Sequence, residues 1–420
     1  MIRIGIVGCG RILNAHLQGY KLLRELGMDN FRITALCARK EEDALMFRKR
    51  GEGPPPRPPV LDPSTGDPLA APHTYLDDFQ PDTDVAVFTD YKEMIASDLV
   101  DAVNDFTTLY LHHMIGQDAL NAGLHLLTQK PLAISVRAGK LLVDLANEKG
   151  LTLGVFENVR QAQGVRAAAW AVQTGVIGDF QMAVLGSVGG LWSPDKIVAE
   201  TPWRHRKLEA GGGGAIDIGV HAMHWAAYVC GDIESVHASV RTFEPTRAHR
   251  DDAGNVQFST DANVDDTYFA TINFANGGIG QLLWSWAGHG EALAIPGAPA
   301  FYGSKGCIKG GEVILDDGTR TPVADLFEAE ASDEVKQQFY PLGLDARLRD
   351  PYAIQQYDWL KAIETGGQPE TDGMVGVMDL AAAFGMIESS QARRTVTMDE
   401  MVNGEVDAYQ REIDAHYGLI

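Results

Sequence analysis

The sequence predicts an α/β fold, in which a doubly wound parallel sheet precedes a second domain with mostly antiparallel strands. Over residues 1–156, short apolar runs alternate with helical segments, which is the pattern of a parallel sheet covered on both faces. Beyond residue 157, strand-like runs succeed one another across hairpin turns such as Asn276-Gly277. We therefore divide the chain into 1–156, an α+β domain over 157–396, and a polar tail over 397–420.

The first fourteen residues predict a strand, a glycine turn and a helix. The apolar run Ile2–Val7 is typical of a strand buried on both faces, and a helix follows from Asn14. Gly8 allows a tight turn, and Gly10 lets the backbone approach a pyrophosphate that the start of the helix attracts. Leu13 stands where such a turn has a third small residue, so helix and strand must pack less closely or the turn must differ. The cofactor-binding candidates in this stretch are Gly8, Gly10, Arg11 and Ile12.

The second predicted strand, Phe31–Cys37, ends in cations rather than in the acidic residue that usually binds the ribose of NAD. Ala38, Arg39 and Lys40 are therefore cofactor-binding candidates, and the two cations favour NADP(H). NAD(H) stays possible, because the acidic run Glu41–Asp43 can fold back to the ribose.

A proline-rich stretch interrupts this first domain. Nine of the nineteen prolines lie between Arg50 and Asp84, so the stretch cannot form a helix and should run extended or as turns. We interpret residues 51–84 as an insertion, placed near the adenosine side of the cofactor or in a subunit contact.

The parallel pattern then resumes, and its strand ends supply further candidates, because ligands of such sheets bind at the carboxyl ends of the strands. Strands are predicted over 85–91, 100–108, 124–128 and 151–156, and helices over 92–97, 110–122 and 135–149. The cofactor-binding candidates at these ends are Thr107, Thr108, His113, Gln129 and Lys130. Asn158 and Arg160, just past the last strand, are substrate-binding candidates, with Trp192 and Tyr302 as further pocket residues.

In the second domain a helix is predicted over 165–173, and two more helices over 352–363 and 375–390. Its strands are predicted over 180–188, 236–243, 266–275, 278–286, 300–302 and 311–315.

Three residues form the predicted catalytic set: Lys130, Asp217 and His221. Lys130 ends a parallel strand, where its ammonium can polarise a substrate oxygen. Asp217 and His221 are four residues apart and would share one helix face, with His221 as proton acceptor and Asp217 orienting it or binding a hydroxyl. The four glycines before Asp217 would let the backbone approach a ligand or cofactor. His224 adds a metal-like spacing, but with no further ligand in view we predict no metal.

Taken together, these motifs resemble the Gfo/Idh/MocA family of glucose–fructose oxidoreductase and inositol dehydrogenase. The matching segments are Gly8-Cys-Gly10 with His16, Val103–His113, Gln129-Lys130-Pro131, Trp203-Arg204, Gly212–His221, Asp265-Asp266, Asn276-Gly277 and Ser285-Trp286. The departures are Leu13, Thr108 in place of Pro, Gln129 in place of Glu, His224 in place of an acidic residue, and the proline-rich insertion.

The resemblance implies an N-terminal Rossmann domain and a C-terminal domain with a large open sheet that forms homodimers or homotetramers. It also implies NAD(P)-linked hydride transfer on a hydroxyl or carbonyl carbon of a sugar, polyol or sugar derivative. Lys130, Asp217 and His221 would be catalytic, and Trp203 and Arg204 would join Asp217 and His221 in binding substrate. The basic cluster Trp203–Lys207 can also bind an anionic group.

One alternative uses the same residues differently, and a second shares only the fold. Some relatives look like glycosidases that keep the nucleotide, oxidise C3 transiently, eliminate the aglycone and reduce again. A non-catalytic nucleotide-sensing regulator would be expected to lack the catalytic set, which this chain has.

Composition limits the partners. The 420 residues carry a net charge of −22, which argues against nucleic acid or an anionic membrane as partner. No apolar run reaches the length of a membrane span, and no signal peptide is visible. Four scattered cysteines without C-x-x-C spacing indicate a reduced, cytoplasmic location.

Overall fold

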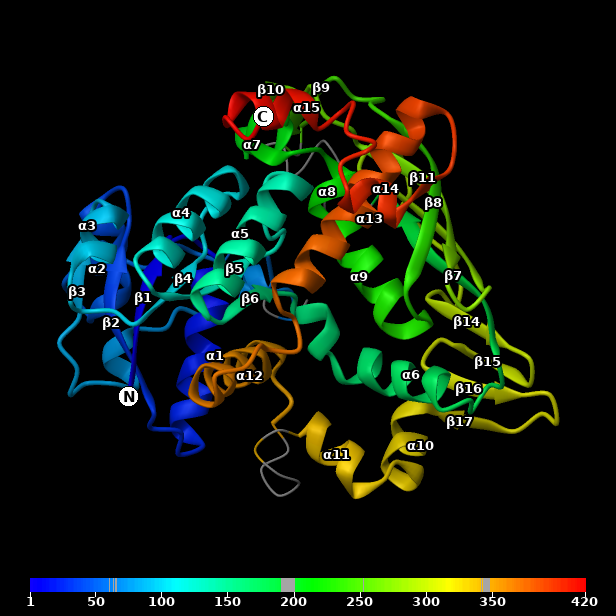
Figure 1. The fold of residues 1–420 in the computed structure, drawn as a ribbon, viewed down its shortest axis with the longest axis horizontal. Helices are drawn as coiled ribbons and strands as arrows, with labels where there is room; N and C mark the ends of the chain where they lie inside the picture. The colour runs from blue at the N-terminus through cyan, green and yellow to red at the C-terminus, as the bar shows by residue number, and fades with distance from the viewer. Residues whose placement is uncertain are drawn as a thin grey trace. The chain divides into compact units, whose positions relative to one another are not determined.

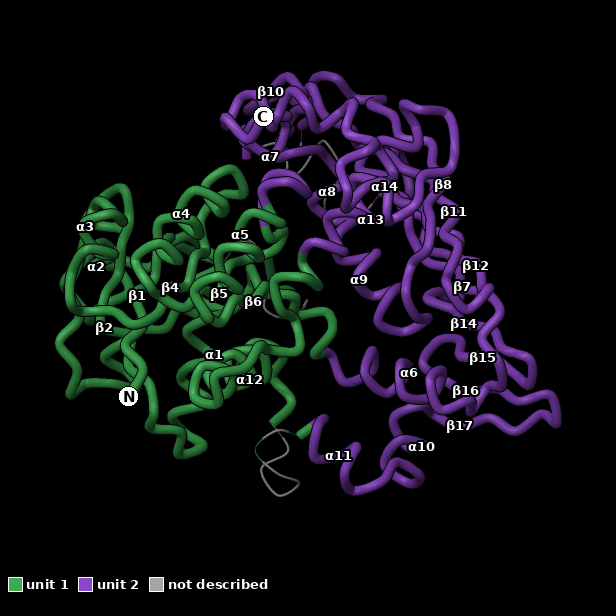
Figure 2. Tube along the Cα trace, viewed as in Figure 1, with its two compact units in different colours: residues 1–132, 139–161, 340–376 green, residues 133–138, 162–339, 377–420 purple. Residues whose placement is uncertain are grey.

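The computed structural model describes residues 1–59, 61–62, 64, 66–189, 201–251, 253–340, 342 and 348–420. Contacts divide the chain into two compact units (Figure 2). Unit 1 contains Met1–Leu132, Gly139–Gln161 and Tyr340–Gly376, and unit 2 contains Ala133–Ala138, Ala162–Phe339 and Val377–Ile420. Unit 1 therefore takes in a C-terminal stretch that lies beyond residue 156.

Unit 1 is built on a six-stranded sheet in the order β3-β2-β1-β4-β5-β6, and every neighbouring pair is parallel. This order is that of a doubly wound dinucleotide-binding sheet, so the predicted fold class of the first domain is confirmed. The strands are β1 (Ile2–Val7), β2 (Phe31–Cys37), β3 (Ala86–Phe88), β4 (Ala102–Asp105), β5 (His125–Gln129) and β6 (Leu153–Phe156).

Helices of unit 1 cover this sheet, and α1 and α12 lie side by side (Figure 1). They pack closely because Gly19 of α1 has no side chain, and a Cβ there would collide with Gln356 of α12. Gln356 Nε2 also donates to the carbonyl of His16 at 2.9 Å. The helices are α1 (Leu13–Glu25), α2 (Glu41–Arg48), α3 (Tyr91–Ala96), α4 (Leu109–Asn121), α5 (Val136–Lys149, which continues from unit 2) and α12 (Pro351–Thr365).

The third strand is shorter than the sequence predicts. Asp90 caps α3 by accepting a hydrogen bond from the Lys92 N–H at 2.8 Å, so the chain turns into a helix at Tyr91. The strand therefore ends at Phe88.

The proline-rich insertion packs onto unit 1 through turns. Its described residues include the 3₁₀ turns η2 (Pro68–Ala70) and η3 (Leu76–Asp78). Gln80 is buried and replaces a strand neighbour of β2, because its amide bonds both the N–H of Ile33 (3.1 Å) and the carbonyl of Ile33 (2.7 Å). The insertion is thus fixed to β2.

Unit 2 is built on a ten-stranded sheet, with the order β17-β16-β15-β14-β7-β12-β11-β8-β18 and β13 paired to β7. Its neighbours are antiparallel except β7 and β12, which run parallel, so the sheet is mostly antiparallel as predicted. The strands are β7 (Phe180–Val188), β8 (Ile233–Arg241), β11 (Thr267–Phe274), β12 (Ile279–Ser285), β13 (Leu293–Ala294), β14 (Ala300–Gly303), β15 (Gly306–Lys309), β16 (Glu312–Leu315), β17 (Arg320–Pro322) and β18 (Val396–Thr397).

A separate hairpin, β9 (Thr246–Arg250) with β10 (Val256–Asp261), was not predicted from the sequence. Its strands are mostly polar, with only Ala248, Val256 and Phe258 as apolar residues, so the apolar signal of a strand is weak.

Helices α9 and α13 belong to the core of unit 2. A buried hydrogen bond of 2.8 Å joins His224 of α9 to Asp379 of α13, and Ser389 of α13 accepts from the Ala238 N–H of β8 at 3.0 Å. The helices are α6 (Gln163–Gln173), α7 (Lys207–Ala210), α8 (Gly214–Asp217), α9 (Gly219–Cys230), α10 (Val323–Glu330), α11 (Asp333–Phe339), α13 (Gly373–Ala392, which begins in unit 1), α14 (Met398–Val402) and α15 (Arg411–His416). Within the described chain, no helix is long and apolar enough to cross a membrane.

The stretch predicted to be a polar tail is anchored in unit 2. Thr397 and Glu400 form a capping box at the start of α14, and Ile413 of α15 is fully buried. Asp414 accepts a hydrogen bond of 2.5 Å from the Ser135 hydroxyl. Helices as short as α14 and α15 carry little hydrophobic periodicity, and Ser135 and Asp414 are 279 residues apart, which is why the sequence pattern missed these contacts.

Candidate functional site

The glycine turn after β1 has the geometry of a dinucleotide-binding turn. Gly8 has a φ of 103°, and a Cβ there would lie 2.7 Å from the carbonyl group of Phe106. A Cβ at Gly10 would meet no atom within 4 Å, so space is open beside the backbone. Ile12 is the N-cap of α1 and makes no side-chain hydrogen bond to its first amide groups. The turn therefore fits a pyrophosphate, which the helix N-terminus attracts.

The departure at Leu13 is absorbed by the core of unit 1. Leu13 is the first residue of α1 and is fully buried in that core. The core of unit 1 therefore accepts a large side chain at the position where a small one was expected. Arg11, one residue before the N-cap, is exposed, and its guanidinium donates to the carbonyl of Pro58 at 2.7 Å.

The end of β2 carries two exposed cations. Ala38 is buried and donates its N–H to the carbonyl of Phe88 at 3.1 Å, whereas Arg39 and Lys40 are exposed. Lys40 Nζ lies 3.9 Å from the Glu42 carboxylate, a surface pair that contributes little to stability.

The end of β4 is organised by a buried carboxyl group. Asp105 accepts hydrogen bonds from the Thr107 N–H (3.0 Å) and hydroxyl (2.6 Å), and burial raises the pKa of Asp105 while His112 opposes that rise. Thr108 is the N-cap residue of α4. Burial, together with a smaller contribution from neighbouring His112, lowers the pKa of His113 to about 4. At neutral pH, His113 is therefore uncharged.

His112, which the sequence did not single out, joins the ends of β4 and β5. Its Nδ1 lies 2.8 Å from the carbonyl of Pro131, and its Nε2 lies 3.3 Å from the carbonyl of Thr107. Both His112 and His113 are buried in α4. The sequence pattern of the helix therefore could not show which of the two histidines bonds the ends of both strands.

Gln129 is the last residue of β5, and Lys130 follows it. Both the oxygen and the nitrogen of the Gln129 side-chain amide make hydrogen bonds. Its Oε1 accepts from the Lys130 N–H at 2.9 Å, and its Nε2 lies 3.1 Å from His16 Nε2. Since a backbone N–H only donates, the Gln129 oxygen must face Lys130 and its NH₂ must face His16. His16 Nε2 therefore accepts, and its ring proton is on Nδ1. The half-buried Lys130 precedes Pro131 through a cis bond.

His16 occupies an aromatic box. Its ring stacks on Phe106 with centroids 3.5 Å apart and meets Phe156 and Tyr352 edge-on. Burial holds the pKa of His16 well below its ordinary value. The amide of Gln129 suits this neutral ring, since it donates to His16 without adding a charge.

Replacing Gln129 by Glu should move the proton of His16. Two acceptors would otherwise face each other, so the ring should shift its proton to Nε2 and bind a second proton more readily, which raises the pKa of His16. The bond from the Lys130 N–H should persist, because a carboxylate oxygen accepts it. Histidine-ring NMR measures both the tautomer and the titration. A ring that stays protonated on Nδ1 alone and titrates unchanged would contradict the assigned bridge.

The substrate candidates of unit 1 lie in the 3₁₀ turn η4 (Asn158–Gln161). Arg160 Nε donates to the Glu370 carboxylate at 2.9 Å, so this cation is already paired within unit 1. Asn158 is partly exposed at the start of the turn.

In unit 2, Asp217 forms an ion pair with Arg204. Arg204 belongs to the 3₁₀ turn η6 (Pro202–His205), and its Nε donates to Asp217 Oδ2 at 3.1 Å. The guanidinium of Arg204 lies over the ring of Trp203, 4.4 Å from its centroid. Three of the predicted substrate residues, Trp203, Arg204 and Asp217, are thus neighbours.

Asp217 and His221 are on two successive short helices rather than on one. Asp217 is the last residue of α8, Ile218 is the N-cap of α9, and His221 lies in the first turn of α9. Both side chains are partly exposed. His224 is buried against Asp379 instead. Within the ranges that the structure describes, no three His, Cys, Asp or Glu side chains are grouped to hold a metal ion.

The glycine run before Asp217 approaches the chain's own backbone. A Cβ at Gly213 would collide with the carbonyl of Asp265, and one at Gly214 would lie 2.7 Å from the ring of Trp284. The Asp265 carboxylate accepts from the N–H groups of Gly213 (2.8 Å) and Ala215 (2.7 Å). Burial raises the pKa of Asp265 to about 6, and these two bonds oppose the rise. The expectation that the glycines admit a ligand was therefore wrong for Gly213 and Gly214.

The basic cluster Trp203–Lys207 is neutralised inside unit 2. Besides the pair of Arg204 with Asp217, Arg206 bonds Glu209 at 2.9 Å, and Lys207 bonds Glu412 at 2.7 Å. His205 is buried, 2.7 Å from the guanidinium of Arg247.

The predicted catalytic residues are distributed over both units. Lys130 lies in unit 1, and Asp217 and His221 lie in unit 2, so their convergence on one site stays a prediction. Trp192 lies outside the described residues, and Tyr302 is a partly exposed residue of β14.

Two family models match the chain. One describes an oxidoreductase family with an NAD-binding Rossmann fold and matches residues 70–157, and the other describes the GFO/IDH/MocA C-terminal domain and matches residues 165–309. The glycine turn and the first part of the insertion precede the first match.

Among curated proteins, the chain is 29% identical to levoglucosan dehydrogenase from Pseudarthrobacter phenanthrenivorans, over 66% of this chain and 75% of the relative. It is 27% identical to 1,5-anhydro-D-fructose reductase from Ensifer adhaerens, over 72% of this chain and 81% of the relative.

Among solved structures, levoglucosan dehydrogenase in complex with NADH and L-sorbose has a TM-score of 0.70 at 19% identity, covering 96% of this chain and 100% of the other. An Agrobacterium radiobacter oxidoreductase in complex with NAD⁺ has a TM-score of 0.68 at 18% identity, covering 95% and 99%. These likenesses establish the fold. With the two family models and the curated relatives, they lead to one conclusion: the chain belongs to the Gfo/Idh/MocA family of nicotinamide-dependent oxidoreductases.

Proposed function

We propose that the protein transfers a hydride between NADP(H) and a hydroxyl or carbonyl carbon of a sugar, polyol or sugar derivative. The observation that carries the proposal is the anchoring of Lys130 at the carboxyl end of β5, in a sheet whose glycine turn keeps open space at Gly10. Ligands of doubly wound sheets bind at this edge.

Lys130, Asp217 and His221 are the proposed catalytic residues. When bound, the nicotinamide supplies or accepts the hydride. The Lys130 ammonium polarises the substrate oxygen, and His221 accepts the hydroxyl proton during oxidation and returns it during reduction. Asp217, fixed by Arg204, binds a substrate hydroxyl or orients His221.

An uncharged substrate fits this chain better than an anionic one. Arg204, Arg206 and Lys207 each have a carboxylate partner, and Arg160 is paired with Glu370. Several of the matched relatives are named for uncharged sugars or polyols, among them levoglucosan, D-xylose and myo-inositol. We therefore expect a neutral polyhydroxylated substrate.

The proposal includes a homodimer or homotetramer formed through the large sheet. Met182 of β7 and Ile279 of β12 are register partners, Phe269 of β11 lies on the same face, and all three are exposed. An exposed apolar face of this kind is typical of a subunit contact. Light scattering after size exclusion measures the assembly.

Cofactor titration followed by a substrate panel tests the proposed reaction. NADPH and NADH are titrated by fluorescence, and the better-bound nucleotide is then assayed with levoglucosan, D-xylose, myo-inositol and related polyols. We expect tighter binding of NADPH and a net change in nicotinamide absorbance with at least one compound. Binding of neither nucleotide would overturn the proposal. Aglycone release from aryl glycosides without net nicotinamide change would replace it with the redox-neutral glycosidase.

A further inference from the structure

The proline-rich insertion reaches the glycine turn through one residue, Arg57. Its Nη1 donates to the carbonyl of Cys9, between Gly8 and Gly10, at 3.2 Å. Its Nη2 forms an ion pair with Asp43, in the first turn of α2. Arg57 thus spans the gap from the turn after β1 to the helix after β2, with about a third of its side chain exposed.

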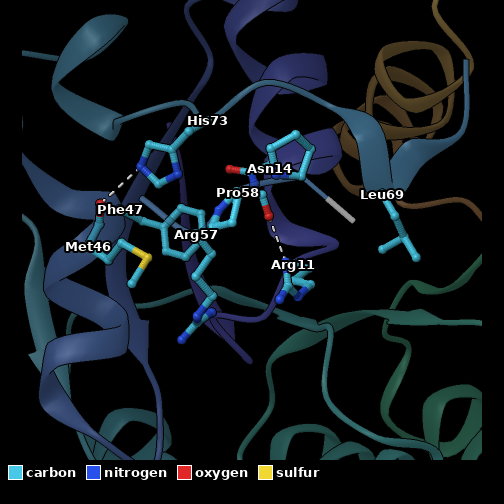
Figure 3. Close-up of a pocket in the computed structure, with 9 residues that line it drawn as sticks. Arg11, Asn14, Met46, Phe47, Arg57, Pro58, Leu69 and His73 are labelled. Atoms are coloured by element: carbon cyan, nitrogen blue, oxygen red, sulfur yellow. Dashed lines mark hydrogen bonds between the residues drawn. The ribbon is translucent and has the colours of Figure 1, made fainter. Parts of the chain in front are cut away.

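The chain around Arg57 is stiff and fixed. Pro58 and Pro59 lock the backbone that follows, and proline also restricts the residue before it. Figure 3 shows Arg11 of the turn bonded to the Pro58 carbonyl, and His73 of the insertion bonded to the Met46 carbonyl of α2 at 3.1 Å. The same residues line a small pocket that contains both Arg11 and Arg57. The insertion is therefore held by hydrogen bonds beside the glycine turn that follows β1.

Arg57 lies beside the region in which dinucleotide-binding units read the adenosine ribose, because it joins the glycine turn to the first turn of α2. In such units, the end of the second strand provides an acidic residue for the ribose hydroxyls of NAD, or an arginine for the 2′-phosphate of NADP. The end of β2 offers two exposed cations, Arg39 and Lys40. Asp43, which follows them in α2, has its negative charge neutralised by Arg57 of the insertion. A guanidinium has five N–H donors, so the bonds to Cys9 and Asp43 do not exhaust it.

We propose that the insertion is part of the cofactor site, and that Arg57 is a specificity-determining residue that binds the adenosine 2′-phosphate of NADP(H). The inference rests on the proposed function only in requiring that a nicotinamide dinucleotide binds at the glycine turn. Arg57 supplies a charge-assisted donor to the phosphate, and it also compensates Asp43, which would otherwise repel that phosphate.

The alternative role for the Arg57–Asp43 pair is binding of the ribose hydroxyls of NAD(H), and it predicts a different response to mutation. If Arg57 merely oriented Asp43 toward the ribose hydroxyls, loss of Arg57 would weaken NADH binding at least as much as NADPH binding. A phosphate-binding Arg57 affects NADPH alone, because only NADPH carries the 2′-phosphate.

Calorimetric or fluorescence titration of NADPH and NADH with the full-length chain, without any substrate, separates these roles. In Arg57→Gln, the dissociation constant of NADPH should rise about tenfold or more, while that of NADH should change by less than about threefold. Arg50→Gln is the matched control, since Arg50 adjoins the same insertion but pairs with Asp78 and stacks on Tyr75. It should bind both nucleotides as the unmodified protein does.

Asp43→Asn provides a second variant, which keeps Arg57 and so stays informative if Arg57→Gln does not fold. Removal of the carboxylate should tighten NADPH binding and leave NADH binding unchanged. Weaker NADH binding in Asp43→Asn, or unchanged NADPH binding in a folded Arg57→Gln, would overturn the inference. If the unmodified protein binds neither nucleotide, the proposed function itself fails, which is a separate outcome.

Discussion

Replacing Lys130 by methionine should lower kcat by about a thousandfold while the dissociation constant of the nicotinamide nucleotide changes by less than about threefold. Methionine keeps much of the length and apolar volume of the lysine stem and removes the ammonium that is proposed to polarise the substrate oxygen. The backbone hydrogen bond from residue 130 to Gln129 does not depend on the side chain and should persist. Steady-state kinetics on the substrate found in the panel, together with cofactor titration, gives both quantities.

Lys149→Met is the control for that variant. Lys149 is exposed at the last position of α5 in unit 1, so the same change of charge and size there should leave turnover intact. If Lys130→Met retained more than about a tenth of the turnover, Lys130 would not be the polarising group that contributes factors of this size. Equal losses of turnover and nucleotide affinity would assign it to cofactor binding instead.

The sheet of unit 1 could be predicted because its information is local. A strand that is buried on both faces is mostly apolar, and β1, β2, β4, β5 and β6 are each wholly or largely buried. Glycine after β1 and lysine after β5 are then placed at the carboxyl edge by topology alone. The placement of Gly8 and Lys130 at this edge was predicted in this way, and their roles stay predictions.

Contacts between distant parts of the chain could not be predicted. His16 and Gln129 are 113 residues apart, and Arg57 meets Cys9 across 48 residues. Helical and strand periodicity predict contacts only between residues close in sequence, so they give no information about pairs this far apart. The substitution of Gln for Glu at position 129 looked like the loss of a charge, and only the neutral, buried ring of His16 explains why an amide belongs there.

The glycines before Asp217 illustrate a different limit of sequence reasoning. Glycine signals that something approaches the backbone, but not what approaches it. At Gly213 the neighbour is Asp265 of the same unit, whose carboxylate accepts a hydrogen bond from the Gly213 N–H. This contact fixes the start of α8, the helix that ends at Asp217.

The contact between Gly213 and Asp265 depends in turn on Arg247, a buried arginine that bonds the carbonyl of Asp265. Replacing Arg247 by methionine should lower the free energy of unfolding by about 3–5 kcal/mol, since it leaves a buried charge and several carbonyls unpaired. Arg247 is fully buried, and its Nη2 donates to the carbonyls of Val264 (3.0 Å) and Asp265 (3.1 Å). It also lies 3.7 Å from the buried carboxylate of Asp266. Burial lowers the pKa of Arg247, and the two aspartates oppose that change.

Arg250→Met isolates the effect, because Arg250 lies on the same strand, β9, and is exposed. Its midpoint of thermal or urea unfolding should match that of the unmodified protein. Arg247 donates to the carbonyl of Asp265, and the Asp265 carboxylate holds the amides of Gly213 and Ala215 that begin α8. Folded Arg247→Met should therefore lose turnover as Asp217 shifts, with cofactor affinity unchanged. A variant as stable and active as Arg250→Met would show that this buried network does not position Asp217.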